Sequence, residues 1–282
     1  LADALSSGAD NFIRCPGEAL QWHTRRVSCL QEILTYDPDV ICLQEVDHFH
    51  DFFKVHLERV GYRGTFKPKP YSPCLDCITN NGPDGCAVFY KSEKFSLVAS
   101  TCPVLQVTER GHTWPTNQVA VLLRLKCKSP EDNHGREFLV GTTHLKAKAS
   151  WHNLRHLQGL NLLEVIAKEA DNCPLVLGGD FNAEPFENVY KAFQASSLAL
   201  DSVYKCLSAD GNSEPPYTTW KIRPTGESCH TLDYVWYSRN QFRPVRVLEL
   251  PSEEDIGKDR LPSHRYPSDH VSLVADFAFK SQ

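Results

Sequence analysis

The sequence predicts an α/β fold in which two β-sheets pack against each other and helices cover their outer faces. Short runs rich in β-branched and aromatic residues are many, whereas stretches with helical period are few. The chain has 282 residues, which is enough to bury a substantial core. No internal repeat, low-complexity tract or Gly/Ser-rich linker divides it, so we expect one domain over residues 1–282.

Helices are predicted where apolar residues recur every three or four positions. Such stripes lie within residues 20–34, 49–60, 154–170 and 186–193. The first stripe consists of Leu20, Val27, Leu30 and Leu34, and the third includes Leu154, Leu157, Leu160, Leu163, Ile166 and Ala170. We expect each stripe to face the core, and Gly61 to end the second helix.

Strands are predicted at short apolar runs bounded by turn-forming residues. These runs cover residues 40–46, 86–90, 95–99, 119–125, 138–145, 175–177, 232–237, 245–250 and 271–279. Three long connections, at 67–85, 209–230 and 251–268, are too irregular in composition for regular structure. Because they also hold aromatic and charged residues that a merely solvated loop does not require, we expect them to wall a site.

Charge and hydropathy exclude two classes of protein. The formal charge of −5 and the isoelectric point near 6.2 give no protein-wide positive field, so any basic site for a nucleic acid must be local. No apolar run approaches the roughly 20 residues that span a bilayer, and the run at 119–125 is itself interrupted by Arg124. We therefore expect no membrane insertion.

The cysteines are predicted to be reduced thiols. There are eleven, an odd number at irregular spacings, and several lie inside apolar runs where a thiol behaves as a small hydrophobe. Reduced cysteines indicate an intracellular compartment. Cys74, Cys77 and Cys86 could form half of a zinc site, but no second Cys-x-x-Cys completes it.

Polar residues of one chemical kind recur at the ends of the apolar runs. They are Glu45, His144, Asp180, Asn182, Asp233, Asp269 and His270. A single Asp before a helix is ordinarily a cap, and a single His near a core is ordinarily hydrogen-bonded to backbone. A carboxylate or imidazole beside a buried strand is costly unless it is paired or bound to metal. The recurrence therefore predicts that all seven converge on one site.

This combination of carboxylates, an amide and imidazoles favours hydrolysis of phosphate esters with a hard cation. Carboxylate oxygens such as those of Glu45 suit Mg²⁺, with Mn²⁺ as the alternative. Asp233 could hold the tautomer of His270 through one ring nitrogen. The chain contains neither a P-loop nor a Gly-x-Ser-x-Gly elbow, which argues against P-loop nucleotide hydrolysis and serine-esterase chemistry.

Five motifs resemble the exonuclease/endonuclease/phosphatase superfamily, in its order and at its spacing. They are Leu43-Gln44-Glu45-Val46, Thr143-His144-Leu145-Lys146, Gly179-Asp180-Phe181-Asn182, Leu232-Asp233-Tyr234 and Ser268-Asp269-His270. Within that superfamily the chain resembles the deadenylase-related branch over nearly its whole length. The resemblance implies a DNase-like four-layer α/β sandwich, with two central mixed sheets flanked by helices. The family begins with a strand ending in Trp-Asn, whose Asn helps to place the metal. In this chain either that strand lies upstream of Leu1 or the metal site is incomplete, because Asn11 lies too far along the sequence to replace that Asn.

The resemblance also implies a role for each residue of the site. Glu45 would be the main Mg²⁺ ligand, and Asp180 would act on an attacking water that Asn182 orients. The other four would surround the phosphate: His144 and His270 contact it, Asp233 supports His270, and Asp269 lies in the metal and water network.

The segments at 69–74, 80–86 and 215–221 resemble one group of this branch, which implies NADP⁺ and NADPH as substrates that lose the 2′-phosphate. The residues implied to contact the substrate are Lys69, Asn81, Lys146, Lys148, Trp220 and Arg223. Close relatives carry Arg where this chain has Lys148, a change that keeps the charge but loses bidentate geometry.

Two other functions stay open. One is a 3′–5′ poly(A) exoribonuclease with the same metal site, which the overall acidity disfavours because a groove that tracks RNA needs several phosphate contacts. The other is a non-catalytic nucleotide- or RNA-binding module, which is disfavoured because the catalytic positions carry competent residues. We expect a monomer in the cytoplasm, or one directed to mitochondria by a segment upstream of this chain.

Overall fold

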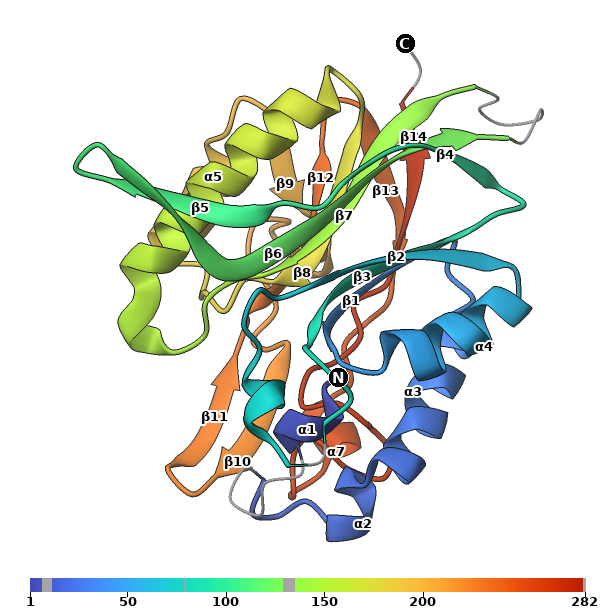
Figure 1. The fold of residues 1–282 in the computed structure, drawn as a ribbon, viewed down its shortest axis with the longest axis vertical. Coiled ribbons are helices and arrows are strands. Elements are labelled where there is room, and N and C mark those ends of the chain that lie inside the picture. The colour runs from blue at the N-terminus through green and yellow to red at the C-terminus, as the bar shows by residue number, and fades with distance from the viewer. Residues whose placement is uncertain (7–11, 79, 129–134, 281–282) are drawn as a thin grey trace.

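The computed structural model describes residues 1–6, 12–78, 80–128 and 135–280. Two β-sheets lie face to face, and helices cover the outer face of each (Figure 1). The layers follow the order α3 and α4, the smaller sheet, the larger sheet, then α5 and α6. This arrangement confirms the predicted four-layer α/β sandwich.

The smaller sheet has the strand order β1-β3-β2, and its strands pair antiparallel. Its elements and the N-terminal helices are α1 (Asp3–Ser6), α2 (Gly17–Leu20), α3 (Trp22–Tyr36), β1 (Val40–Val46), η1 (Phe49–Phe53), α4 (Lys54–Arg59), β2 (Tyr62–Pro68), η2 (Pro73–Asp76) and β3 (Gly85–Lys91). Phe49 and Phe53 of η1, Leu57 of α4 and Cys29 of α3 are buried and pack on this sheet. This packing fixes the end of β1, where Glu45 lies.

The larger sheet is mixed, because β7 and β8 are parallel while the other pairs are antiparallel. The strand order is β4-β6-β7-β8-β12-β9, with β5 also paired to β6. Its elements are β4 (Phe95–Thr101), β5 (Val104–Glu109), β6 (His112–Cys127), β7 (Glu137–His144), η3 (Ala149–Trp151), α5 (His152–Ala170), β8 (Leu175–Asp180), α6 (Asn188–Gln194), β9 (Leu200–Ser202), η4 (Val203–Leu207) and β12 (Asp233–Ser238).

Two further two-stranded antiparallel sheets complete the fold. One pairs β10 (Thr219–Arg223) with β11 (Gly226–His230), and the other pairs β13 (Phe242–Val247) with β14 (Ala275–Phe279). The helix α7 (Glu253–Ile256) lies in the long connection from β13 to β14. In Figure 1 the β10–β11 hairpin projects below the larger sheet, on the same side of the molecule as the N-terminus.

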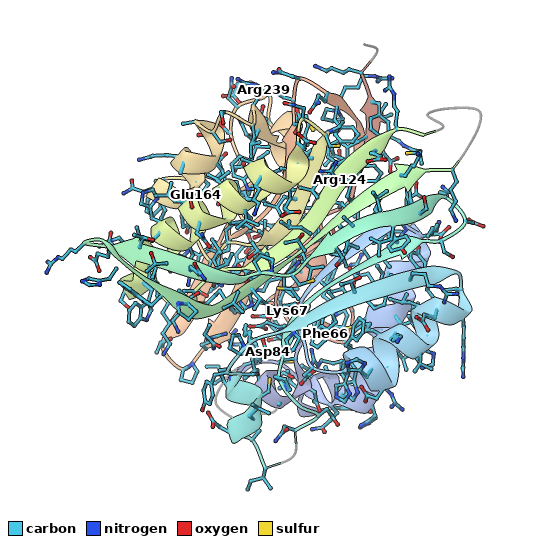
Figure 2. The ribbon with its side chains drawn as sticks, turned by 45° about the horizontal axis from the view of Figure 1, so that its top comes forward. Phe66, Lys67, Asp84, Arg124, Glu164 and Arg239 are labelled. Carbon is cyan, nitrogen blue, oxygen red and sulfur yellow. The ribbon has the colours of Figure 1, made fainter. Side chains whose placement is uncertain are left out.

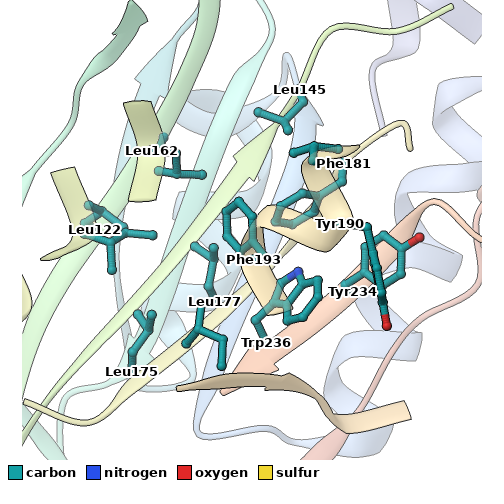
Figure 3. Packing of buried hydrophobic residues seen from close by; sticks show 14 of the residues in the cluster. Leu122, Leu145, Leu162, Leu175, Leu177, Phe181, Tyr190, Phe193, Tyr234 and Trp236 are labelled. Atoms are coloured by element: carbon teal, nitrogen blue, oxygen red, sulfur yellow. The ribbon is translucent and has the colours of Figure 1, made fainter. Parts of the chain in front are cut away.

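The core beneath α5 and α6 is rich in aromatic residues (Figure 3). Tyr190 and Phe193 of α6 lie 5.0 and 5.4 Å, between ring centroids, from Trp236 of β12. Side chains of this size bury large apolar areas and favour such tilted contacts. This packing holds in place the strands of the larger sheet whose ends carry the polar residues.

The predicted helices form, but two of them present a different face to the core. In α3, Val27 is 58% exposed, whereas Arg25 and Cys29 are buried. In α5, Leu160 is exposed, whereas Arg155 and Gln158 are buried. In each helix a buried arginine donates hydrogen bonds to backbone carbonyls of neighbouring loops. These bonds fix the rotation of the helix about its axis, which the spacing of apolar residues alone predicted wrongly.

The predicted strands are confirmed at most positions, although the three long connections hold more regular structure than expected. The connection at 209–230 contains the β10–β11 hairpin, 67–85 contains η2, and 251–268 contains α7. The strands β2, β5 and β9 were also not predicted. β11 is mostly exposed and polar and β10 is mostly half-buried, so neither strand shows regular alternation of apolar and polar residues.

Two further observations concern the chain as a whole. All eleven cysteines are free thiols. Among the described residues, no helix is both long and apolar enough to cross a membrane.

Candidate active site

Sheet register brings three of the predicted site residues together. The last residues of the parallel strands β7 and β8, His144 and Asp180, lie opposite each other. Asp180 is also paired with Asp233, the first residue of β12. Because residues opposite each other across neighbouring strands point to the same face, the three side chains gather at one edge of the larger sheet.

The loop after α7 adds a second imidazole to this edge. His270 contacts Asp233 through its Nδ1 atom, which lies 2.7 Å from Oδ2. One polar atom from each of Asp180, Asp233 and His270 lies within 4.8 Å of the others, and this is the only such group of possible metal ligands in the described part of the chain. His144 Nε2 lies 3.6 Å from Asp180 Oδ2.

Glu45 approaches the same place from the smaller sheet. Its Oε1 lies 4.0 Å from His144 Nε2. Glu45 has a φ of 53°, and the pairing of β1 with β3 shifts register between Leu43 and Val46. A local irregularity of this kind redirects a side chain out of the regular alternation of a strand. Glu45 therefore faces the opposing sheet.

A cavity of about 750 Å³ lies between the two sheets. Its lining includes Glu45, Asp180, Asp233, Asp269 and His270 together with apolar residues of both sheets. A volume of this size is typical of sites that bind small molecules and cofactors. Six of the seven predicted catalytic residues thus meet at one place, and Asn182 joins them through its backbone N–H, which donates to Asp180 Oδ1 at 2.7 Å.

Asp269 is held by cations of the β10–β11 hairpin. Its Oδ2 accepts a hydrogen bond from the Lys221 ammonium and lies 4.0 Å from Arg223 Nη2. The same oxygen lies 3.8 Å from His270 Nε2. Burial alone would raise the pKa of Asp269, but Lys221 and His270 hold this pKa well below its usual range. Asp269 is therefore ionised.

The two imidazoles are charged differently. Burial lowers the pKa of a histidine, but the carboxylates of Asp233 and Asp269 outweigh it and raise the pKa of His270 to about 9. Burial, followed by the positive charge of Lys69, lowers the pKa of His144 well below its usual value. At neutral pH the site therefore offers one cationic and one neutral imidazole.

The arrangement of carboxylates fits a bound divalent cation. Burial, followed by the negative charge of Asp233, raises the pKa of Asp180 to about 7 even with the cationic His270 nearby, so a further cation would stabilise the ionised pair. Hard carboxylate oxygens of this kind are the ligands that Mg²⁺ and Mn²⁺ prefer. The donor set therefore satisfies the chemical requirement of the predicted cofactor.

The predicted substrate-binding residues are distributed more widely. Lys146 and Lys148 follow the end of β7, and the Lys146 ammonium lies 5.7 Å above the ring of Trp151. Arg223 reaches Asp269 and also covers the ring of Phe12.

Asn81 and Trp220 make other contacts. Asn81 contacts His48, with 2.7 Å between Nδ2 and Nε2, and Trp220 donates from Nε1 to Glu227. Among the described contacts, neither side chain touches the catalytic group.

Lys69 acts on His144 through its positive charge, but it is already paired. Its ammonium lies 2.6 Å from Oδ2 of Asp84, and both side chains are almost fully buried. Figure 2 shows Asp84 close to Lys67 and Phe66, where β2 ends and β3 begins. Asp84 also accepts a hydrogen bond from Ser72, so this ion pair fixes the connection between these strands.

Replacing Lys69 with methionine is expected to destabilise the protein by about 3–5 kcal/mol, because a buried carboxylate then loses its charged partner. Lys94→Met is the matched control, since the ammonium of Lys94 pairs with Asp39 on the exposed surface, where such a bond contributes under about 1 kcal/mol. Urea unfolding of both variants measures the difference. Equal losses in the two variants would contradict a structural role for the buried pair.

Two residues of the site were missed in the sequence. Thr218 donates to Asp233 Oδ2 at 2.5 Å and accepts from the backbone N–H groups of Leu232 and Asp233. Lys221 forms the ion pair with Asp269. Both lie in the connection that was expected to be irregular, and in the segment 215–221 only Trp220 was selected. Nothing in a single sequence marks a threonine as the partner of a distant carboxylate.

Comparisons with known proteins agree with this geometry. The model of the Endonuclease/Exonuclease/phosphatase family matches residues 6–270. Nocturnin from Rattus norvegicus is 53% identical over 100% of this chain, which spans 64% of that protein's length. The 3′-5′-exoribonuclease subunit Ccr4 of the CCR4-Not complex from Emericella nidulans is 27% identical, over 98% of this chain and 50% of that protein.

Two solved structures are similar over 99% of the chain. The human nocturnin catalytic domain with a bound sulfate anion has a TM-score of 0.84 and 46% identity, with 92% of its own chain covered. ANGEL2, a 2′,3′-cyclic phosphatase in complex with adenosine-2′,3′-vanadate, has a TM-score of 0.81 and 25% identity, with 93% covered. The chain therefore belongs to the endonuclease/exonuclease/phosphatase family and, within it, to the nocturnins.

Proposed function

We propose that this chain is a divalent-metal-dependent phosphohydrolase that removes the 2′-phosphate from NADP⁺ and NADPH to give NAD⁺ and NADH. The observation that carries the proposal is the convergence of Asp180, Asp233 and His270 within 4.8 Å. Carboxylates and an imidazole at this spacing can activate water and stabilise charge on a phosphoryl group.

The chain's own residues divide the chemistry between them. Asp180 orients and deprotonates the attacking water from the end of β8, 3.6 Å from His144. His270, kept cationic by Asp233 and Asp269, donates to a phosphoryl oxygen as negative charge develops there. Asn182 is fixed beside Asp180 because its Nδ2 donates to the carbonyl of Leu145 at 3.1 Å.

A divalent cation would be held mainly by Glu45, with the Asp180 and Asp233 carboxylates close by. When bound, it would neutralise charge on the phosphoryl oxygens. The side chain of Glu45 is 36% exposed, which leaves room for the water ligands that Mg²⁺ retains.

The substrate is proposed from the chemistry of the relatives and from the cations at the cleft. The ANGEL2 complex contains an adenosine carrying a 2′,3′-vanadate, and the human nocturnin domain binds a sulfate anion. NADP⁺ and NADPH carry their extra phosphate on the 2′-oxygen of an adenosine. Lys146, Lys148 and Arg223 are then available for the phosphates that link the two nucleotides.

The direct test compares three substrates with one preparation. In Mg²⁺, the wild-type chain is expected to release one phosphate per NADPH or NADP⁺. It is expected to leave a labelled oligo(A) intact, because the acidic chain has no protein-wide positive field to bind the phosphates of an RNA strand. Phosphate is measured colorimetrically and RNA on a denaturing gel. Shortened RNA with intact NADPH would instead favour the exoribonuclease that its similarity to Ccr4 suggests. If neither substrate were turned over, the result would favour a non-catalytic nucleotide- or RNA-binding module.

A further inference from the structure

A buried arginine on α5 has no part in the mechanism above. Arg155 is 1% exposed, and its guanidinium makes five hydrogen bonds. Nη2 bonds both carboxylate oxygens of Glu187, at 2.9 and 2.8 Å, and Nε bonds one of them at 3.2 Å. Such a bidentate pair is strong and geometrically specific.

The remaining nitrogen of Arg155 reaches the loop that carries two cations of the site. Nη1 donates to the carbonyls of Lys146 and Lys148, at 3.0 and 2.6 Å. The backbone N–H of Lys146 donates to Gln158, another buried side chain of α5. Lys148 has a φ of 79°, a conformation that a lysine adopts only where its surroundings impose it.

Glu187 belongs to the segment that follows the catalytic end of β8. Its Oε1 also accepts from the backbone N–H of Glu184. The two segments that Arg155 and Glu187 join therefore leave neighbouring parallel strands, just beyond His144 and Asp180. The ion pair ties the lysine loop to the segment after Asp180 at a fixed distance.

We infer that Arg155 and Glu187 are positioning residues that fix the loop bearing Lys146 and Lys148, and thereby set how tightly the site holds the phosphates of its substrate. Arg155 touches neither the reacting atoms nor the substrate, since it is enclosed by α5 and the two loops. The inference rests on the proposed function for its substrate, but the position of the loop can be measured without turnover.

The first experiment separates binding from chemistry. Arg155→Lys keeps the charge but cannot form the bidentate bond and reach both carbonyls together. We expect KM for NADPH to rise about tenfold with kcat within about twofold, because the lysines contribute to ground-state and transition-state binding alike. Glu187→Gln is expected to act in the same direction. A fall in kcat with unchanged KM would overturn the inference.

A thermodynamic cycle that combines Arg155→Lys with replacement of both lysines distinguishes positioning of the lysine loop from a general loss of stability. In a chain that already carries Lys146→Ala and Lys148→Ala, Arg155→Lys is expected to change KM by less than about twofold, because the groups it positions are gone. A purely structural effect would persist in that background. An undiminished rise in KM there would overturn the inference.

Trypsin gives a readout that does not depend on activity, because it cleaves after Lys146 and Lys148. The loop is held by the two bonds from Arg155, so Arg155→Lys is expected to speed cleavage at these bonds about tenfold or more. Cleavage after Arg110, in the β5–β6 turn, serves as the internal control and should not change. If wild type releases no phosphate from NADPH, the proposed function fails, and the rates of trypsin cleavage after Lys146 and Lys148 then test the inference by themselves. Unchanged cleavage at these two sites in Arg155→Lys would overturn the inference.

Discussion

Replacing Asp180 with asparagine is expected to lower kcat for phosphate release from NADPH by about 10³-fold, since general-base catalysis of this kind contributes on that order. The amide has nearly the shape of the carboxylate but cannot accept a proton from water. Asp180 lies at the centre of the site, 3.6 Å from His144 and paired in register with Asp233. Initial rates at saturating Mg²⁺ and NADPH measure the effect.

The same substitution is not expected to weaken the fold. Asp180 is a buried carboxylate next to the negative charge of Asp233, and burial and this charge both oppose its ionisation. Removing the charge relieves that repulsion. In EDTA the melting temperature of Asp180→Asn should therefore equal or exceed that of wild type, which shows that lost activity does not come from unfolding. Asp201→Asn, which alters a carboxylate paired with Lys205 outside the site, should keep full activity.

Replacing Glu45 with glutamine is expected to lower kcat/KM at fixed, limiting Mg²⁺ by about 10³-fold, because the contribution of a bound cation to charge stabilisation is several kcal/mol. The amide oxygen remains, but the negative charge that attracts the cation is lost. Higher Mg²⁺ should restore part of the activity. The affinity for Mn²⁺, followed by the EPR signal of the free ion, should fall because a charged carboxylate ligand is lost.

Glu137→Gln is the control for that substitution, because Glu137 begins β7 at the end of the strand opposite His144. Its Mn²⁺ affinity and its rate should match those of wild type. If Glu45→Gln lost activity while binding Mn²⁺ with unchanged affinity, Glu45 would not be the main metal ligand. The rest of the site would still be free to act through Asp180 and His270.

The sequence predicted the strands that carry the catalytic residues because their apolar runs are continuous. β7 and β8 are buried on both sides between the layers, so nearly every residue in them is apolar or small, and the polar residue that ends each run stands out. The hairpin β10–β11 was missed for the opposite reason. It has no continuous buried run, and its order comes from cross-strand pairing and from contacts such as the Lys221–Asp269 ion pair.

The helices were predicted in place but not in rotation. Apolar period indicates which residues can be buried, and it cannot anticipate that Arg155 is buried because loops distant in sequence offer it Glu187 and two carbonyls. The sequence likewise could not show the partner of Lys69, which the family resemblance implied to contact the substrate. The structure adds a buried bond to Asp84, 15 residues further along the chain.

The sequence by itself indicated the layered α/β fold through its short apolar runs, and the family through five motifs that resemble it. It also indicated the chemical character of the site, because carboxylates and imidazoles at the ends of buried strands are too costly to occur repeatedly without a shared partner. Only the tertiary structure decided how these groups are paired: which imidazole is cationic, which lysine is already neutralised, and which arginine holds the loop at the cleft. Those properties depend on distances between segments far apart in the chain, and electrostatic energies vary with distance and burial, neither of which is written in the order of residues.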